Sequence, residues 1–159
     1  MIPTRLLSVL LAEDDASDVI LLRRAFKDVD LTNPLHVTTD GQEAVEFLDG
    51  AKARPEERLP ALVILDLKMP RRSGLQVLQW MRDQPILCSL PAVIFSSSAN
   101  RSDIECAYDF GANAYLIKPP SMAERTELAR FIKDWLRLIQ PPLGASESFR
   151  SAQAQRAER

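Results

Sequence analysis

Short apolar runs alternate along the chain with segments in which apolar residues recur at helical spacing. The runs lie at residues 6–12, 35–39, 61–65, 91–96 and 114–117. Run 61–65 has no polar alternation, which is typical of a strand buried on both faces of a parallel sheet. Strands that alternate with helices favour such a sheet with helices on both sides. The pattern therefore predicts a doubly wound α/β fold with five parallel strands and five helices.

Capping residues and glycines set the expected helix boundaries. Asp15 to Asp18 offer caps for the first helix, and Asp40-Gly41 begin a second helix that should stop at Gly50. The later helices are expected at residues 74–82, 102–110 and 121–139, and residues 51–60 form a charged loop with two prolines. The folded domain is predicted to span residues 5–139.

The amino-acid composition and net charge limit the classes of function that the chain could have. The chain has 159 residues, 46% hydrophobic and 26% charged, with a formal net charge of -2. These values fit one globular domain and give no reason to expect nucleic acid as a partner. No run is long enough to cross a bilayer, so we expect a soluble, cytoplasmic protein with no membrane partner. Cys88 and Cys106 lack metal-ligand spacing and are interpreted as reduced, half-buried core residues.

Residues 140–159 are rich in Pro, Ser, Gln, Arg and Glu, with a single aromatic residue. Such a segment cannot bury enough apolar surface to order itself, so a disordered C-terminal tail is predicted. It is also too short to form an output domain.

Carboxylates follow two of the predicted strands. Asp66 comes directly after run 61–65, and Glu13, Asp14 and Asp15 follow the first run. Carboxyl ends of parallel strands meet at one edge of the sheet, where open α/β proteins bind ligands. Taken singly, Asp66 is more often a solvated loop residue, and the other acids are more often helix-start residues. Together they would crowd like charges, which raises pKa values or binds a cation, and oxygen ligands suit Mg²⁺.

Two further strand ends carry complementary groups. Ser96 ends the fourth run with a hydroxyl, and Lys118 follows the fifth with a cation. Acids, a hydroxyl and a lysine at successive strand ends predict an anion site beside a metal site. A carboxylate there could act as a nucleophile toward a phosphoryl group.

These residues resemble the receiver domain of two-component response regulators. The resemblance is carried by Asp66-Leu-Lys-Met-Pro, Gly74, the Glu13-Asp14 pair, Ser96 and Lys118-Pro119. It covers residues 5 to about 139 and implies a flavodoxin-like, chemotaxis-regulator-like sheet of strand order 2-1-3-4-5. The Glu-Asp-Asp start, the long loop after the second helix and Phe-Ile-Lys-Asp-Trp-Leu at 131–136 are similar to stand-alone regulators that partner phytochromes.

The resemblance also implies the roles of the acids. Asp66 would accept a phosphoryl group from the phosphohistidine of a sensor histidine kinase, in this subgroup one of phytochrome type. Asp14, Asp66 and the backbone carbonyl of Lys68 would ligate Mg²⁺, and Glu13 would act mostly through a bound water. The protein would be no enzyme beyond its own phosphoryl transfer and autodephosphorylation.

The resemblance assigns the remaining site residues to phosphate binding and switching. Lys118 would pair with the phosphate, Ser96 would swing to donate a hydrogen bond to it, and Tyr115 would be the aromatic switch. Lys118-Pro119 would form a cis peptide bond that presents the lysine. Lys68 and Ser98 occupy positions where family members tune the phosphate lifetime.

Three other functions compete with this one. A phosphatase with an aspartate nucleophile needs a second acid two residues on, where this chain has Lys68. A nucleotide-binding flavodoxin-like protein would need a glycine-rich first loop, but this loop is Glu-Asp-Asp. A degenerate receiver that acts as a phosphorylation-independent binding module would have lost an acid or the lysine, and none is missing.

The last helix suggests a second interaction surface. Its apolar residues spread over more than one face: Phe131, Ile132, Trp135, Leu136, Leu138 and Ile139. So wide an apolar arc is typical of a helix that a partner also covers. We expect a homodimer through the fourth helix, fifth strand and fifth helix, with Phe131, Trp135 and Leu138 at the contact.

Overall fold

The structure is a computed structural model that describes residues 7–54 and 59–140. Five parallel strands form one sheet in the order β2-β1-β3-β4-β5. The strands are β1 (Val9–Ala12), β2 (Leu35–Thr38), β3 (Leu62–Leu65), β4 (Ala92–Ser96) and β5 (Ala114–Ile117). The predicted fold class and strand order are therefore confirmed.

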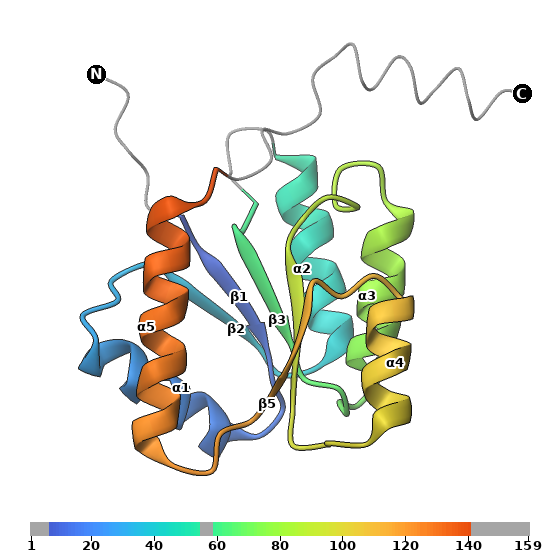
Figure 1. Cartoon of the computed structure of the whole chain (residues 1–159). Helices are drawn as coiled ribbons and strands as arrows, with labels where there is room; N and C mark the ends of the chain where they lie inside the picture. Colours follow the sequence, from blue (N-terminus) through green and yellow to red (C-terminus); the bar gives the residue numbers. More distant parts are fainter. Residues whose placement is uncertain (1–6, 55–58, 141–159) are drawn as a thin grey trace, which may run out of the picture.

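Five helices cover the two faces of the sheet (Figure 1). Helices α1 (Ala16–Asp28) and α5 (Met122–Leu138) lie on one face, and α2 (Gly41–Ala53), α3 (Gly74–Asp83) and α4 (Arg101–Asp109) lie on the other. Each face has its own apolar core, one under α1 and α5 and one under α2 and α3. The central strands supply both cores, which explains why β1 and β3 consist of buried apolar residues throughout.

The strand register brings the carboxyl ends together. Ala12 at the end of β1 lies opposite Leu65 at the end of β3, and Ser96 at the end of β4 lies opposite Ile117 at the end of β5. Residues that follow these four strands therefore share one edge of the sheet.

Local capping starts the helices at this same edge. The Asp15 side chain accepts a hydrogen bond from the backbone N–H of Ser17 and caps α1. Ser73 and Ser121 each form a capping box, with Gln76 and Glu124 respectively. Such caps satisfy N–H groups that have no partner in the first helical turn, so they fix where each chain segment leaves the edge.

Two local predictions were wrong. Helix α2 continues through Gly50 to Ala53, because one more turn buries Ala51 and a glycine inside a helix costs only about 1 kcal/mol. Cys106 is exposed on α4 instead of half-buried, while Cys88 is partly buried, and both thiols are free. Strands β1 to β4 are also shorter than their apolar runs, because backbone pairing rather than hydrophobicity defines their ends, whereas β5 matches its run.

Within the ranges described, no helix has the length and apolar character needed to cross a bilayer. The predicted tail lies, from residue 141 onward, outside the described residues.

Candidate functional site

Three carboxylates gather at the carboxyl edge of the sheet. Oxygen atoms of Glu13, Asp14 and Asp66 lie within 4.8 Å of one another. Glu13 and Asp66 are buried, with 1% and 8% of their surface exposed, whereas Asp14 is exposed. The arrangement follows from the fold, since Glu13 and Asp14 continue β1 and Asp66 continues its neighbour β3.

The backbone holds Asp66 firmly in place. Its N–H donates to the carbonyl of Ala12 (2.9 Å), and its carboxylate Oδ1 accepts from the N–H of Leu67 (2.8 Å). Gly74 at the start of α3 packs directly on the Asp66 carbonyl, leaving no room for a side chain at that position. Gly74 is thus required for the close approach of α3 to the acid.

Lys118 points into the acidic cluster from the end of β5. Its Nζ lies 2.7 Å from Glu13, 2.8 Å from Asp18 and 3.5 Å from Asp66. Burial lowers the pKa of Lys118, but hydrogen bonds to Asp18 and Glu13 outweigh this effect, so the net pKa is raised. The lysine is therefore a permanent cation beside Asp66.

The acids experience the opposite effect of burial. Desolvation raises the pKa of Glu13 from 4.5 to about 7, although Lys118 and the N–H of Asp15 lower it. Desolvation also raises the pKa of Asp66 against the lowering effect of Lys118. The charge of one lysine thus does not fully offset the desolvation of these two carboxylates. A hard divalent cation would supply the missing positive charge, and the oxygen-only donor set fits Mg²⁺ or Mn²⁺.

Ser96 lies at the neighbouring strand end in a hydrogen-bonded loop. Its buried hydroxyl accepts from the N–H of Ser98 (3.1 Å), and its carbonyl accepts from the N–H of Lys118 (2.8 Å). Ser98 in turn donates its hydroxyl to Asp103 on α4 (2.5 Å). The Tyr115 hydroxyl donates to the Ser98 carbonyl (2.7 Å). Ser96 and Tyr115 are therefore joined through one loop residue.

The expected cis peptide bond is absent. No cis bond occurs among the described residues, so Lys118-Pro119 is trans. The trans form of an X–Pro bond is favoured by about 0.5–1 kcal/mol, and Lys118 reaches the acids without the cis form.

Two further charged residues, Asp18 and Arg125, lie at the site. Asp18, on the first turn of α1, contacts Lys118, and its other oxygen lies 3.2 Å from Arg125 Nη2 on α5. The sequence pattern indicates only a capping role for Asp18, and it gives Arg125 no role at the site. The signal for Arg125 in the sequence is its helical spacing, which places it on the same face as Ala129, Ile132 and Leu136. In the structure this arginine is indeed buried, with 7% of its surface exposed.

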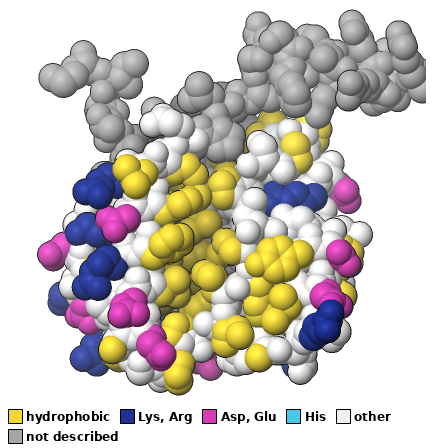
Figure 2. All heavy atoms as spheres, viewed as in Figure 1, with side chains coloured by type: hydrophobic (Ala, Val, Ile, Leu, Met, Phe, Trp, Pro, Cys, Tyr) yellow, Lys and Arg dark blue, Asp and Glu magenta, His cyan; other side chains and the backbone are white. Residues whose placement is uncertain are grey.

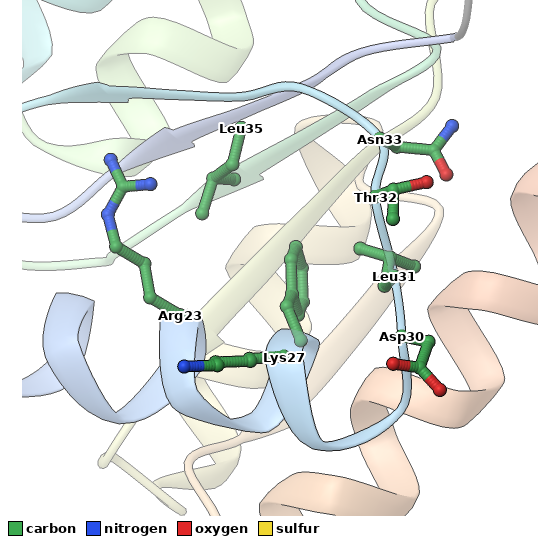
Figure 3. A pocket seen from close by; sticks show the side chains of 8 residues that line it. Arg23, Lys27, Asp30, Leu31, Thr32, Asn33 and Leu35 are labelled. Carbon is green, nitrogen blue, oxygen red and sulfur yellow. The ribbon is translucent and has the colours of Figure 1, made fainter.

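A groove of about 300 Å³ lies elsewhere on the molecule (Figure 3). Arg23 and Lys27 of α1 and Leu35 at the start of β2 line it, together with the connection between these elements. Because it adjoins the amino end of β2, it is separate from the acidic cluster at the carboxyl edge.

A doubly wound sheet with acids, a hydroxyl and a lysine at its carboxyl edge defines a class of phosphoryl-accepting signalling proteins. The chain belongs to the response regulator receiver domain family, whose sequence profile it matches over residues 9–130. Members of this family take phosphoryl groups from histidine kinases. The family resemblance is therefore confirmed, and a degenerate binding module is not favoured.

The chain is also similar to individual response regulators. Response regulator Rcp1 of Synechocystis sp. is 28% identical over 135 residues, covering 84% of this chain and 92% of that protein. The structure of its Mn(2+)-bound form has a TM-score of 0.73 and covers 85% of this chain and 98% of its own. Response regulator RPA3017, from red light signaling of R. palustris, gives a TM-score of 0.77 at 30% identity, over 86% and 99% of the two chains. The bacteriophytochrome response regulator RtBRR gives 0.67 at 34% identity, over 96% and 94%.

Proposed function

We propose that Asp66 accepts a phosphoryl group from a histidine kinase and that this modification switches an interaction surface of the protein. The observation that carries the proposal is the position of Lys118, whose ammonium group lies 3.5 Å from Asp66 and 2.7 Å from Glu13. A cation beside a buried carboxylate provides the counter-charge that an acyl phosphate needs.

The transfer uses the side chains at the edge of the sheet. An Asp66 carboxylate oxygen attacks the phosphorus of the phosphohistidine, and the phosphorus–nitrogen bond breaks as the new oxygen–phosphorus bond forms. Lys118 stabilises the negative charge on the phosphoryl oxygens. Burial keeps water away from Asp66 and strengthens this interaction.

Asp14, Asp66 and the backbone carbonyl of Lys68 would hold Mg²⁺, with Glu13 contributing mostly through a water. The metal supplies positive charge to the transferring phosphoryl group. The support is the cluster of three carboxylates and the raised pKa values of its two buried members. We propose Mg²⁺ rather than Mn²⁺ as the cation that this cluster binds.

The switch would run through Ser96 and Tyr115. A phosphoryl group on Asp66 adds roughly one unit of negative charge and attracts the Ser96 hydroxyl. When that hydroxyl turns away, the Ser98 N–H loses its acceptor, and Ser98 also holds Asp103 of α4 and the Tyr115 hydroxyl. Phosphorylation would therefore change the loop between β4 and α4 and the surface around it.

Incubation with acetyl phosphate and Mg²⁺, followed by intact mass measurement, tests the central step. Wild type should gain one phosphoryl group, while Asp66→Asn and samples in EDTA should gain none. Asp109→Asn, which removes an exposed acid from α4, is the matched control and should behave as wild type. An unmodified wild type, or equal gain in Asp66→Asn, would contradict the proposal.

The kinase that supplies the phosphoryl group is proposed to be of phytochrome type, acting in the cytoplasm. The support is the likeness to RPA3017 and to the bacteriophytochrome response regulator RtBRR, which matches over 96% of this chain. A phosphorylated bacterial phytochrome kinase should transfer its label to this protein within minutes, and faster than an unrelated histidine kinase does. Equal rates from both kinases would remove this assignment.

A homodimer through α4, β5 and α5 is also part of the proposal. Figure 2 shows apolar side chains gathered in the middle of the face where Figure 1 places β5 between α5 and α4. The large exposed apolar residues on these elements, and at the C-cap of α4 in the case of Phe110, are Tyr108, Phe110, Ile117, Phe131 and Leu138.

The position of this face on α5 follows from its neighbours. Lys133 donates to the carbonyl of Val29 at the end of α1, so that flank of α5 faces α1. Phe131, Trp135 and Leu138 lie on the opposite flank of the helix, toward β5. On the other side, the Tyr108 hydroxyl of α4 accepts from the N–H of Tyr115 on β5 (3.2 Å). The apolar residues therefore border the open edge strand from both sides.

Sedimentation at several concentrations tests the dimer. Wild type should associate more strongly as its concentration rises, and Phe131→Glu should shift it to monomer. Ile20→Glu is the matched control, because Ile20 is equally exposed at 64% but lies on α1. A wild-type mass that stays monomeric at all concentrations, with and without a phosphoryl analogue, would count against the dimer.

A further inference from the structure

Lys118 is part of a chain of ion pairs that continues away from the acidic cluster. Asp18 Oδ2 lies 2.8 Å from Lys118 Nζ, and Asp18 Oδ1 lies 3.2 Å from Arg125 Nη2. The chain links β5, α1 and α5, so it crosses the packing between the two helices on one face of the sheet.

Arg125 is held in place by burial rather than by many partners. The side chain is 9% exposed, and its Nη1 atom is buried without a hydrogen-bond partner among the described residues. Burying a guanidinium with an unused donor is costly in free energy, and the bond from Arg125 to Asp18 offsets part of this cost. Arg125 thus fixes the orientation of the Asp18 carboxylate.

Asp18 competes with Asp66 for the lysine. The ammonium group has three donors, and its contacts with Glu13 and Asp18 are shorter than its 3.5 Å distance to Asp66. Glu13 belongs to the cluster that can hold a cation, and a cation would draw its carboxylate away from Lys118. Asp18 is outside that cluster, so it remains a competitor after a metal has bound.

We propose that Asp18, oriented by Arg125, restrains Lys118 in the unphosphorylated protein and sets how readily this lysine pairs with a phosphoryl group on Asp66. Both are positioning residues that act through Lys118. The inference rests on the proposed phosphoryl acceptance by Asp66 and adds a control on its strength.

The restraint predicts opposite effects for the two partners. Asp18→Asn removes the competing charge and one source of repulsion toward an anion, so a phosphoryl analogue should bind about tenfold more tightly. Arg125→Met removes the cation that shares the Asp18 carboxylate with Lys118, so Asp18 should hold Lys118 more tightly. The analogue should therefore bind about threefold more weakly. A merely structural ion pair would give losses of stability in both variants and no gain in affinity.

Titration of the full chain with beryllofluoride in saturating Mg²⁺, followed by fluorine NMR, measures this affinity. Asp28→Asn and Arg130→Met are the charge controls, because each removes the same charge from an exposed position on the same helix. Arg125→Lys keeps the cation and should stay close to wild type. In the Asp18→Asn background, Arg125→Met should have little further effect. Mg²⁺ affinity without the analogue should be unchanged in the Arg125 variants.

Tighter binding by Asp18→Asn together with weaker binding by Arg125→Met would support the restraint. Binding by Asp18→Asn that is no tighter than by Asp28→Asn, in a protein with a cooperative thermal transition, would overturn it. If Asp18→Asn does not fold, equal affinities of Arg125→Met and Arg130→Met would overturn it instead. Failure of wild type to bind the analogue, or equal binding by Asp66→Asn, would remove the proposed function itself and the restraint with it.

Discussion

Removal of divalent cations should expose the electrostatic cost of burying Glu13. Burial raises the pKa of Glu13 from 4.5 to about 7, so the folded protein holds a proton that the unfolded chain has released between these pH values. The free energy of unfolding should therefore fall as the pH rises from about 4.5 to about 7. The difference of about 2.5 pH units corresponds to about 3 kcal/mol, an upper figure for this side chain.

The neighbouring groups do not reverse this direction. The pKa of Asp66 is also raised, so its contribution to the free energy of unfolding likewise falls as the pH rises above its ordinary pKa of 3.8. The pKa of Lys118 is raised above 10.5, so its contribution is complete at lower pH and is lost only in strongly alkaline solution. Within the window between about pH 4.5 and 7, the two acids therefore set the slope.

Urea unfolding in EDTA across this window provides the assay, since a single domain of this size should unfold in one transition. Glu13→Gln should flatten most of the slope and should be more stable than wild type at about pH 8. Glu127→Gln, an exposed acid on α5, should keep the wild-type slope. Saturating Mg²⁺ should also reduce the slope, because a bound cation lowers the pKa values of nearby acids. Equal slopes for wild type and Glu13→Gln in EDTA would refute this reasoning.

Four further outcomes are expected from substitutions at single positions. Gly74→Ala should lower the free energy of unfolding by about 3 kcal/mol, because its methyl group would overlap the Asp66 carbonyl, whereas Gly50→Ala should raise it by about 0.5–1 kcal/mol; urea denaturation measures both. Ser73→Ala removes the capping box of α3 and should cost about 1 kcal/mol in the same assay. Lys68→Ala should change the lifetime of phosphorylated Asp66, because Lys68 is exposed two residues after it and can block or guide water; equal dephosphorylation rates would remove that role.

The location of the main site residues was predictable because parallel strands place their carboxyl ends at one edge. Glu13, Asp66 and Lys118 each directly follow a strand of the sheet, so the fold alone brings them together. The bond between Asp18 and Arg125 was not predictable in this way. It joins residues 107 positions apart and depends on how α1 packs against α5. Periodicity assigns both residues to helices but does not fix the rotation of one helix against the other.

The charges at the site also suggest an order of events. The acidic side chains Glu13, Asp14, Asp18 and Asp66 outnumber Lys118 and Arg125, the cations that contact them. An incoming phosphoryl group adds negative charge, so its binding without a metal would be strongly opposed. A divalent cation that engages the Glu13 carboxylate would reduce this repulsion and also release one donor of Lys118. Asp18 would then be the remaining carboxylate that holds the lysine back, and its bond to Arg125 would tune the response of Asp66 without touching the phosphoryl group.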